Sequence, residues 1–138
     1  MALRKRPPAT DYGLELLLDY NGRQETLPGG YFLKFEIKRT SASDSRPHGL
    51  RYSFTLHDSD SMRILGFDNA HSVKPLGGRG KKPPQHDHWH RTHEDDGRPY
   101  QFIDAASLLD DFYREAEMVL RERGIKLDII GEQNANQE

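Results

Sequence analysis

The 138-residue sequence contains no cysteine, and this absence excludes a group of functions. Without thiols the chain cannot form disulfides, a zinc site with cysteine ligands or a thiol nucleophile. No apolar run approaches the ~18 residues that a membrane span requires. The first ten residues, MALRKRPPAT, lack the apolar stretch of a secretory signal. We therefore expect a soluble cytoplasmic protein without a membrane partner.

Hydrophobic residues are also scarce, at 34% of the chain, and polar residues concentrate at both ends. We expect a mobile basic arm over 1–10, a single α+β domain over 11–130 and a disordered tail over 131–138. The hydrophobic core of such a domain is small. A second copy of the chain, in a homodimer, could complete it.

Charge is divided unevenly along the chain. The net charge of −2 excludes a polycation, so any binding of nucleic acid must be local. Four basic residues and no acidic residue lie between Lys74 and Gln85, whereas six acidic residues and two arginines lie between Asp104 and Glu122. This separation would let one face of the protein bind phosphate while another stays acidic.

Alternation of polar and apolar residues predicts the strands of a sheet. Leu33, Phe35 and Ile37 alternate with charged residues, which is typical of a strand buried on one side. The dipeptide Asn21-Gly22 after a short apolar run is a hairpin signal. We expect antiparallel strands over Leu14–Tyr20, Gln24–Leu27, Tyr31–Arg39, Leu50–His57 and Met62–Phe67.

One helix is well marked near the end of the chain. Asp104 is a candidate N-cap, apolar residues follow it at intervals of three and four, and Gly124 stands where a left-handed residue ends a helix. The segment Ile125–Ile130 could form a last strand. The predicted fold class is α+β, with an antiparallel β-meander of four to five strands and one long C-terminal helix packed on one face.

The segment from Phe67 to His93 concentrates the residue types that carry chemistry. It contains five of the seven histidines, the only tryptophan and the basic run RGKK. Imidazoles titrate near neutral pH, lysines and arginines bind phosphate, and the indole offers a stacking surface. This composition suggests contact with a nucleic acid or a metal, and three interpretations compete.

The first interpretation is a metal site. His86, His88 and His90 alternate, so in an extended segment their imidazoles point to one side and could bind one metal ion. His93, Asp87 or Glu94 could complete the ligands. The spacing differs from the HxHxDH pattern of metallo-hydrolases, so the prediction is no physiological metal and no cofactor.

The second interpretation is RNA cleavage without a metal, in which two histidines act as acid and base. Asp68 and His71, delivered to a strand end, could form an oriented pair. His88 or His90 would supply the second titratable group.

Two further sets of residues would serve RNA in this interpretation. Arg79, Lys81 and Lys82 would bind phosphate. Trp89 and Tyr100 would stack on an unpaired base. The third interpretation assigns no chemistry at all: a polar loop with solvated histidines, held to the core by Trp89.

Four short blocks in order carry a resemblance to a known family. They are Gly66-Phe67-Asp68-Asn69, the pair His88 and His90, the stretch Arg98-Pro99-Tyr100-Gln101-Phe102, and Leu108-Leu109-Asp110-Asp111-Phe112 in the predicted helix. Between roughly Tyr31 and Arg123 this order resembles the TumE family of toxins from bacterial toxin-antitoxin operons. That family has a D-N-x-x-G-K-G-x-H-x-H block, an E-x-P-Y-x-F stretch and a helix with L-x-x-D-F.

The resemblance implies which residues form the family signature. Asp68, Asn69, His88 and His90 would be the polar signature, and within the site Asn69 and Asp111 would be supporting residues. Pro99, Tyr100, Phe102 and Phe112 would complete that supporting block. The chain departs from the family in a longer link, Val73 to Pro84, and in extra histidines at positions 71, 86 and 93.

Membership would imply a toxin that slows growth and is inhibited by a small helix-turn-helix antitoxin encoded beside it. Endoribonuclease activity is our inference from the histidines and cations, not from the family. The alternatives are a non-catalytic adaptor that binds nucleic acid or protein, and a histidine-rich metal-binding regulator.

Overall fold

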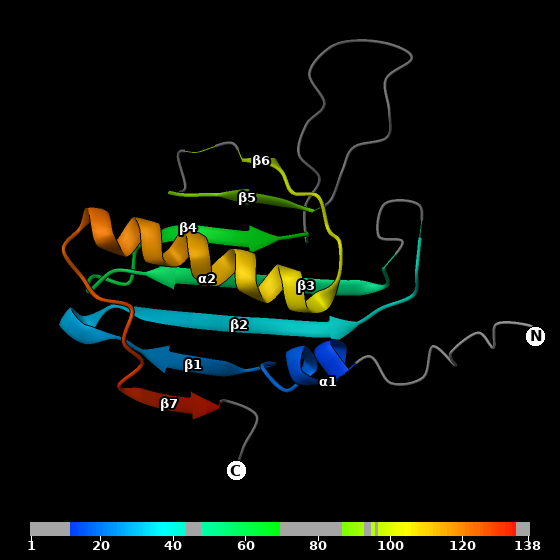
Figure 1. The fold of residues 1–138 in the computed structure, drawn as a ribbon, viewed down its shortest axis with the longest axis horizontal. Coiled ribbons are helices and arrows are strands. Elements are labelled where there is room, and N and C mark those ends of the chain that lie inside the picture. The colour runs from blue at the N-terminus through cyan, green and yellow to red at the C-terminus, as the bar shows by residue number, and fades with distance from the viewer. Residues whose placement is uncertain (1–11, 44–47, 70–86, 93–94, 96, 135–138) are drawn as a thin grey trace, which may run out of the picture.

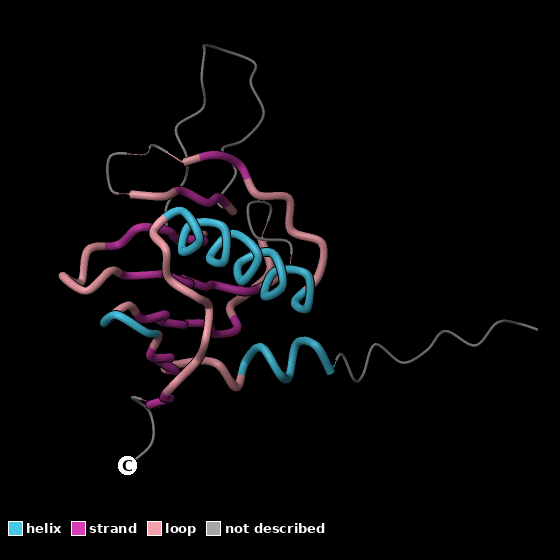
Figure 2. Tube along the Cα trace, turned by 60° about the vertical axis from the view of Figure 1, so that its left-hand side comes forward, coloured by secondary structure: helices cyan, strands magenta, loops and turns pink. Residues whose placement is uncertain are grey.

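The computed structural model describes residues 12–43, 48–69, 87–92, 95 and 97–134. Over these ranges the chain forms a seven-stranded antiparallel sheet in the order β6-β5-β4-β3-β2-β1-β7, with the long helix α2 lying across one face (Figures 1 and 2). The strands are β1 (Arg23–Thr26), β2 (Phe32–Arg39), β3 (Leu50–His57), β4 (Arg63–Asp68), β5 (His88–His90), β6 (Arg98–Pro99) and β7 (Gly131–Asn134). The helices are α1 (Tyr12–Leu18), the 3-10 turn η1 (Pro28–Gly30) and α2 (Ala105–Glu122).

The predicted α+β class with one long C-terminal helix is confirmed, although the sheet has more strands than expected. Alternation correctly identified β2 and β3, whose residues Phe35 and Phe54 pair and are buried on the helix side. Lys34 and Glu36 lie on the opposite side and are exposed. Within the described ranges no helix is long and apolar enough to cross a membrane.

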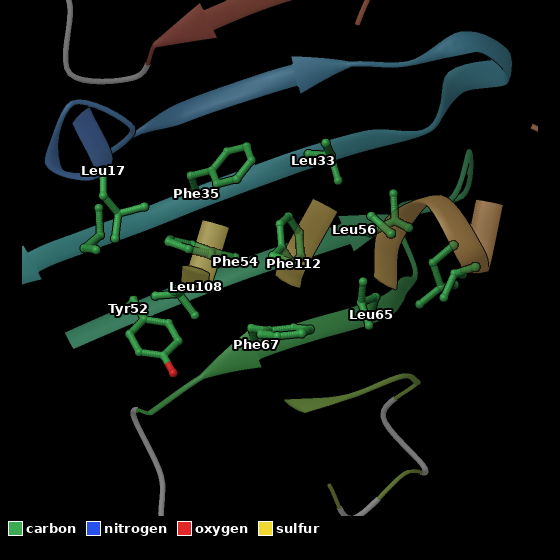
Figure 3. Packing of buried hydrophobic residues seen from close by; sticks show 14 of the residues in the cluster. Leu17, Leu33, Phe35, Tyr52, Phe54, Leu56, Leu65, Phe67, Leu108 and Phe112 are labelled. Carbon is green, nitrogen blue, oxygen red and sulfur yellow. The ribbon is translucent and has the colours of Figure 1, made fainter. Parts of the chain in front are cut away.

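Phe112 of α2 is the centre of the core (Figure 3). Its ring lies 5.6 Å, centroid to centroid, from each of three phenylalanines on neighbouring strands: Phe35, Phe54 and Phe67. The rings meet edge to face, the arrangement that aromatic quadrupoles favour. One side chain therefore joins β2, β3 and β4 to the helix.

The ends of α2 are as predicted. Asp104 is the N-cap, and its carboxylate accepts a hydrogen bond from the backbone N–H of Ser107 at 2.7 Å. Gly124 has φ of +73°, which a residue with a side chain rarely adopts. The backbone N–H of Ile125 then donates to the carbonyl of Leu120 at 2.9 Å and closes the last turn.

The prediction of a strand over Leu14–Tyr20 is wrong, because these residues fall largely in the helix α1. Leu17 is buried, Leu14 and Leu18 pack against the same core, and Leu16 is 62% exposed. Burial therefore follows the three- and four-residue spacing of a helix. The Asn21-Gly22 dipeptide makes no hairpin. Instead, the Asn21 side chain accepts a hydrogen bond from the backbone N–H of Ile37 at 3.0 Å.

The edges of the sheet also differ from expectation. The segment Ile125–Ile130 forms no strand, and Ile129 and Ile130 are exposed. The next four residues form β7 on the free edge of β1, within the segment predicted as a disordered tail. None of its four residues is buried, so this strand leaves little hydrophobic signal in the sequence.

Phe112→Ala should lower the free energy of unfolding by about 3–5 kcal/mol, because it leaves a cavity between the helix and three strands. Urea unfolding would measure the loss. Met118→Ala on the exposed side of the same helix should change stability by less than about 0.5 kcal/mol. Equal losses in the two variants would contradict the central role of Phe112.

Candidate functional site

A cluster of polar side chains lies on β4 and β5, on the face of the sheet away from α2. The two strands pair so that Asp68 is opposite His88 and Gly66 is opposite His90. Phe67 lies between Gly66 and Asp68 on β4 and points into the core on the helix side. Successive side chains of a strand alternate between faces, so Asp68, His88 and His90 share the other face.

One carboxylate contacts both imidazoles. Asp68 Oδ1 lies 3.2 Å from His88 Nε2, and Asp68 Oδ2 lies 3.1 Å from His90 Nε2. The two rings are 5.5 Å apart, centroid to centroid, and the histidines are only 7% and 8% exposed. Asp68 thereby fixes the orientation of two titratable rings in a site with little access to water.

Gly66 provides the space for this arrangement. A Cβ atom at this position would lie 3.4 Å from His90 Nε2 and 3.3 Å from Arg63 Cδ, which is close for real contacts. Glycine within a strand normally weakens it, and often marks a place where another group approaches the backbone. Here the approaching groups are the imidazole and the arginine side chain.

Arg63 belongs to the site, although the sequence did not indicate it. Its Nη1 lies 3.4 Å from His90 Nε2, and its Nε is buried without a hydrogen-bond acceptor in the part of the chain that the structure describes. Burial lowers the pKa of Arg63, against the opposing effects of Asp68 and Asp95. The guanidinium still stays charged at neutral pH.

A β-bulge explains why Arg63 was missed. His57 pairs with Arg63 and Leu56 with Leu65, so Ile64 is an extra residue on β4. Strict alternation along the strand would place Arg63 with Leu65 on the core side. The bulge shifts Arg63 to the face that carries Asp68.

The three ligand atoms of Asp68, His88 and His90 lie within 4.8 Å of one another, so this set could hold a metal ion with a further position open. Arg63 opposes that use. Two like charges about 5 Å apart repel by about 3 kcal/mol at an effective dielectric near 20, and a divalent ion doubles the repulsion. The set with Arg63 included is better suited to an anion such as phosphate.

Several predicted residues fall outside the described ranges. They are His71, Arg79, Lys81, Lys82 and His86, together with the alternative ligands His93 and Glu94. Their roles remain predictions. The structure brings together Asp68, His88 and His90 from the predicted set.

Asn69 holds the chain beside Asp68. Its side-chain oxygen accepts from the backbone N–H of Tyr52 at 3.0 Å, and its side-chain nitrogen donates to the carbonyl of Leu50 at 2.6 Å. The residue is fully buried. Its amide therefore replaces backbone pairing where β4 ends.

Trp89 has ring contacts with both neighbouring strands. It stacks on Phe67 of β4 at 5.8 Å, and the guanidinium of Arg98 of β6 lies 4.2 Å from its ring centroid. Because β4 and β6 flank β5 on opposite sides, a base could stack on Trp89 only if one of these contacts opened. The predicted stacking role would require that change.

Tyr100 is likewise packed against the core. Its ring meets Phe67 edge to face at 5.3 Å, and its hydroxyl donates to Asp111 at 2.6 Å. Burial and the Asp111 carboxylate raise the pKa of Tyr100. Asp111 thus fixes the segment that follows β6 to α2.

A second carboxylate and imidazole pair, on the helix side, anchors β5. The backbone N–H of Leu50 donates to His48 Nδ1, so the ring proton lies on Nε2, which donates to Asp87 at 2.9 Å. The Tyr52 hydroxyl donates to the same carboxylate at 2.8 Å. Asp87 directly precedes His88, so these bonds fix the start of the strand that carries both site histidines.

The sequence offered no signal for this pair, since His48 and Asp87 are 39 positions apart. Burial, followed by the Asp87 charge, raises the pKa of Tyr52, so its hydroxyl stays protonated and donates at any physiological pH. We call His48, Asp87 and Tyr52 the anchor of β5.

The family model described as Toxin TumE matches residues 20–120. This range extends from before β1 to near the end of α2 and includes Asp68, His88, His90 and Arg63. The chain has no significant match among curated proteins or among solved structures.

Asp87→Ala should lower the free energy of unfolding by about 3 kcal/mol, because it leaves the His48 and Tyr52 donors buried without their acceptor. Urea unfolding would measure it. Asp128→Ala, at an exposed carboxylate, is the control and should have little effect. If Asp87→Ala were as stable as the control, the anchor would contribute nothing to β5.

Proposed function

The chain belongs to the TumE family of toxins, and from that premise we propose that it cleaves RNA as a metal-independent endoribonuclease at Asp68, His88 and His90. Family membership makes it the toxin of a toxin-antitoxin pair. RNA as the target and histidine acid-base chemistry are our additions. They rest on the convergence of two imidazoles, one carboxylate and one guanidinium in a single site.

The reaction that suits these groups uses the RNA itself as the nucleophile. The 2′-oxygen attacks phosphorus while a base removes its proton, and the 5′-oxygen leaves with a proton from an acid. The products are a 2′,3′-cyclic phosphate and a 5′-hydroxyl. Imidazole suits both proton transfers because it titrates near neutral pH.

Each group in the site then has a task. One of His88 and His90 accepts the proton of the 2′-hydroxyl, and the other donates a proton to the 5′-oxygen. Asp68 holds both rings in place through contacts with their Nε2 atoms. Arg63 stabilises the charge that develops on phosphate oxygens. Its Nη1, which lies 3.4 Å from His90 Nε2, is the guanidinium nitrogen that would donate a hydrogen bond to a phosphate oxygen.

The proposed cellular setting follows from the family. The toxin acts on RNA in the cytoplasm and slows growth until its antitoxin binds it. We propose that this antitoxin is a small helix-turn-helix protein. The mass of the purified toxin, alone and in the complex, would test the homodimer that the small core suggested.

His88→Ala combined with His90→Ala should abolish growth arrest and lower the rate of RNA cleavage by a factor on the order of 10³, because acid-base groups typically contribute that much. Growth would be followed after induction without the antitoxin. Cleavage would be followed on purified protein, with the 2′,3′-cyclic phosphate identified by mass spectrometry.

The matched control for the double variant is His57→Ala. His57 lies on the same face, but its ring nitrogens bond to the Thr55 hydroxyl and the Ser61 carbonyl. This variant should stay toxic and active. Equal protein levels and melting temperatures are required of all variants. Cleavage should also continue in EDTA, and a loss that zinc restores would contradict the metal-free chemistry.

Arg63→Ala should lower kcat by about 10², since the loss of one donor to the developing oxyanion typically has an effect of this size. Arg63→Lys should recover part of the rate by restoring the charge. Arg91→Ala, at a guanidinium that pairs with Glu122 at 2.9 Å, is the control and should keep the wild-type rate. If Arg63→Ala cleaved RNA normally, Arg63 would have no part in the chemistry.

A further inference from the structure

The face of the sheet opposite α2 carries a polar surface that continues from the site. We call it the open face and define it by six residues of β2 and β3: Lys34, Glu36, Lys38, Arg51, Ser53 and Thr55. The lysines, the glutamate and the arginine are exposed, and Ser53 and Thr55 are half-buried. The helices pack on the other side, so within the described ranges no helix covers this face (Figure 2).

The pairing register joins the open face to the site. Lys34 pairs with Thr55, Thr55 with Gly66, and Gly66 with His90. These residues therefore form one row across four strands. With strands ~4.8 Å apart, the row places Lys34 about 14 Å from His90.

A parallel row reaches the other site histidine. Glu36 pairs with Ser53, Ser53 with Asp68, and Asp68 with His88. Lys38 pairs with Arg51 directly beyond this second row. A strand of RNA with its phosphate between the two histidines would thus lie among these cations as it leaves the site.

Charge distinguishes the two sides of the protein. The open face has three cations, Lys34, Lys38 and Arg51, against the single carboxylate of Glu36. On the opposite side, α2 carries five acidic residues and two arginines. A polyanion is attracted to the first side and repelled by the second.

A groove marks the far end of the open face. It has a volume of about 280 Å³, and Gln24, Lys34, Glu36 and Gln133 are among the residues that line it. Gln24 pairs with both Lys34 and Gln133, so the groove continues the first row beyond β2. Its amide groups can donate and accept hydrogen bonds with sugars and bases.

We propose that the open face binds the single-stranded RNA that flanks the scissile phosphate. Lys34, Lys38 and Arg51 contact backbone phosphates, and the groove receives the nucleotide at the far end. The proposal rests on the proposed nuclease function for the position of the scissile phosphate. A single strand fits because the site histidines are nearly buried, and a flexible strand reaches them more readily than a rigid duplex.

The test replaces the three cations together, in Lys34→Ala, Lys38→Ala and Arg51→Ala. Binding of a labelled single-stranded RNA is measured over a range of salt concentrations, in protein that also carries His88→Ala and His90→Ala so that no cleavage occurs. For single strands each phosphate contact contributes about 0.7 to the slope of log K against log salt, so three lost contacts should lower the slope by about 2. Affinity at low salt should fall at least tenfold.

The control removes the same number of charges from elsewhere on the surface. Arg114→Ala, Arg121→Ala and Arg123→Ala change exposed arginines on and just after α2. This variant should bind RNA with the parental slope and affinity. In the active protein, the open-face variant should raise KM at least tenfold, while its loss in kcat stays within about twofold.

The outcomes separate this inference from the nuclease proposal. If the open-face variant still cleaves RNA and binds it with the parental salt slope, the inference is overturned and the nuclease proposal stands. The inference is also overturned if that variant still binds RNA but no longer binds the antitoxin, because the open face would then be the surface that binds the antitoxin. RNA binding that needs the three cations without any cleavage would support the open face and defeat the nuclease.

Discussion

The register between β4 and β5 is the constraint on which the site depends. A slip of one residue would turn His88 and His90 towards the core and Trp89 towards the open face. Two features of β5 oppose such a slip. Asp87 is held by the buried His48 and Tyr52 donors, and Trp89 is stacked on Phe67.

The strand β5 is short, and its two faces have different tasks. Backbone pairing over three residues gives little stability by itself, so the side chains on the helix side keep the strand in place. Tyr100 adds to them, because its backbone N–H donates to the Asp87 carbonyl and its hydroxyl binds Asp111. The histidines on the other side are thereby positioned without having to stabilise the strand themselves.

The sequence predicted the parts of the fold in which burial follows one regular period. Alternation identified β2 and β3, cap residues identified α2, and the spacing of His88 and His90 placed both on one side. The bulge at Ile64 broke that regularity and hid Arg63. The hydrogen bond between His48 and Asp87 joins segments that are distant in the sequence. Such a pair depends on tertiary packing, which local sequence patterns do not predict.

The site is costly to fold. Two imidazoles surround one carboxylate, and beside them lies a guanidinium whose buried Nε has no acceptor among the residues that the structure describes. These groups lose hydration that their mutual contacts only partly replace. The aromatic core around Phe112 offsets this on the opposite face of the same strands. Because Phe67 packs in that core and Asp68 follows it on β4, packing on one side of the sheet fixes the geometry of the charged groups on the other. Preorganised polar groups of this kind suit binding and transformation of an anion, since they need not rearrange when it arrives.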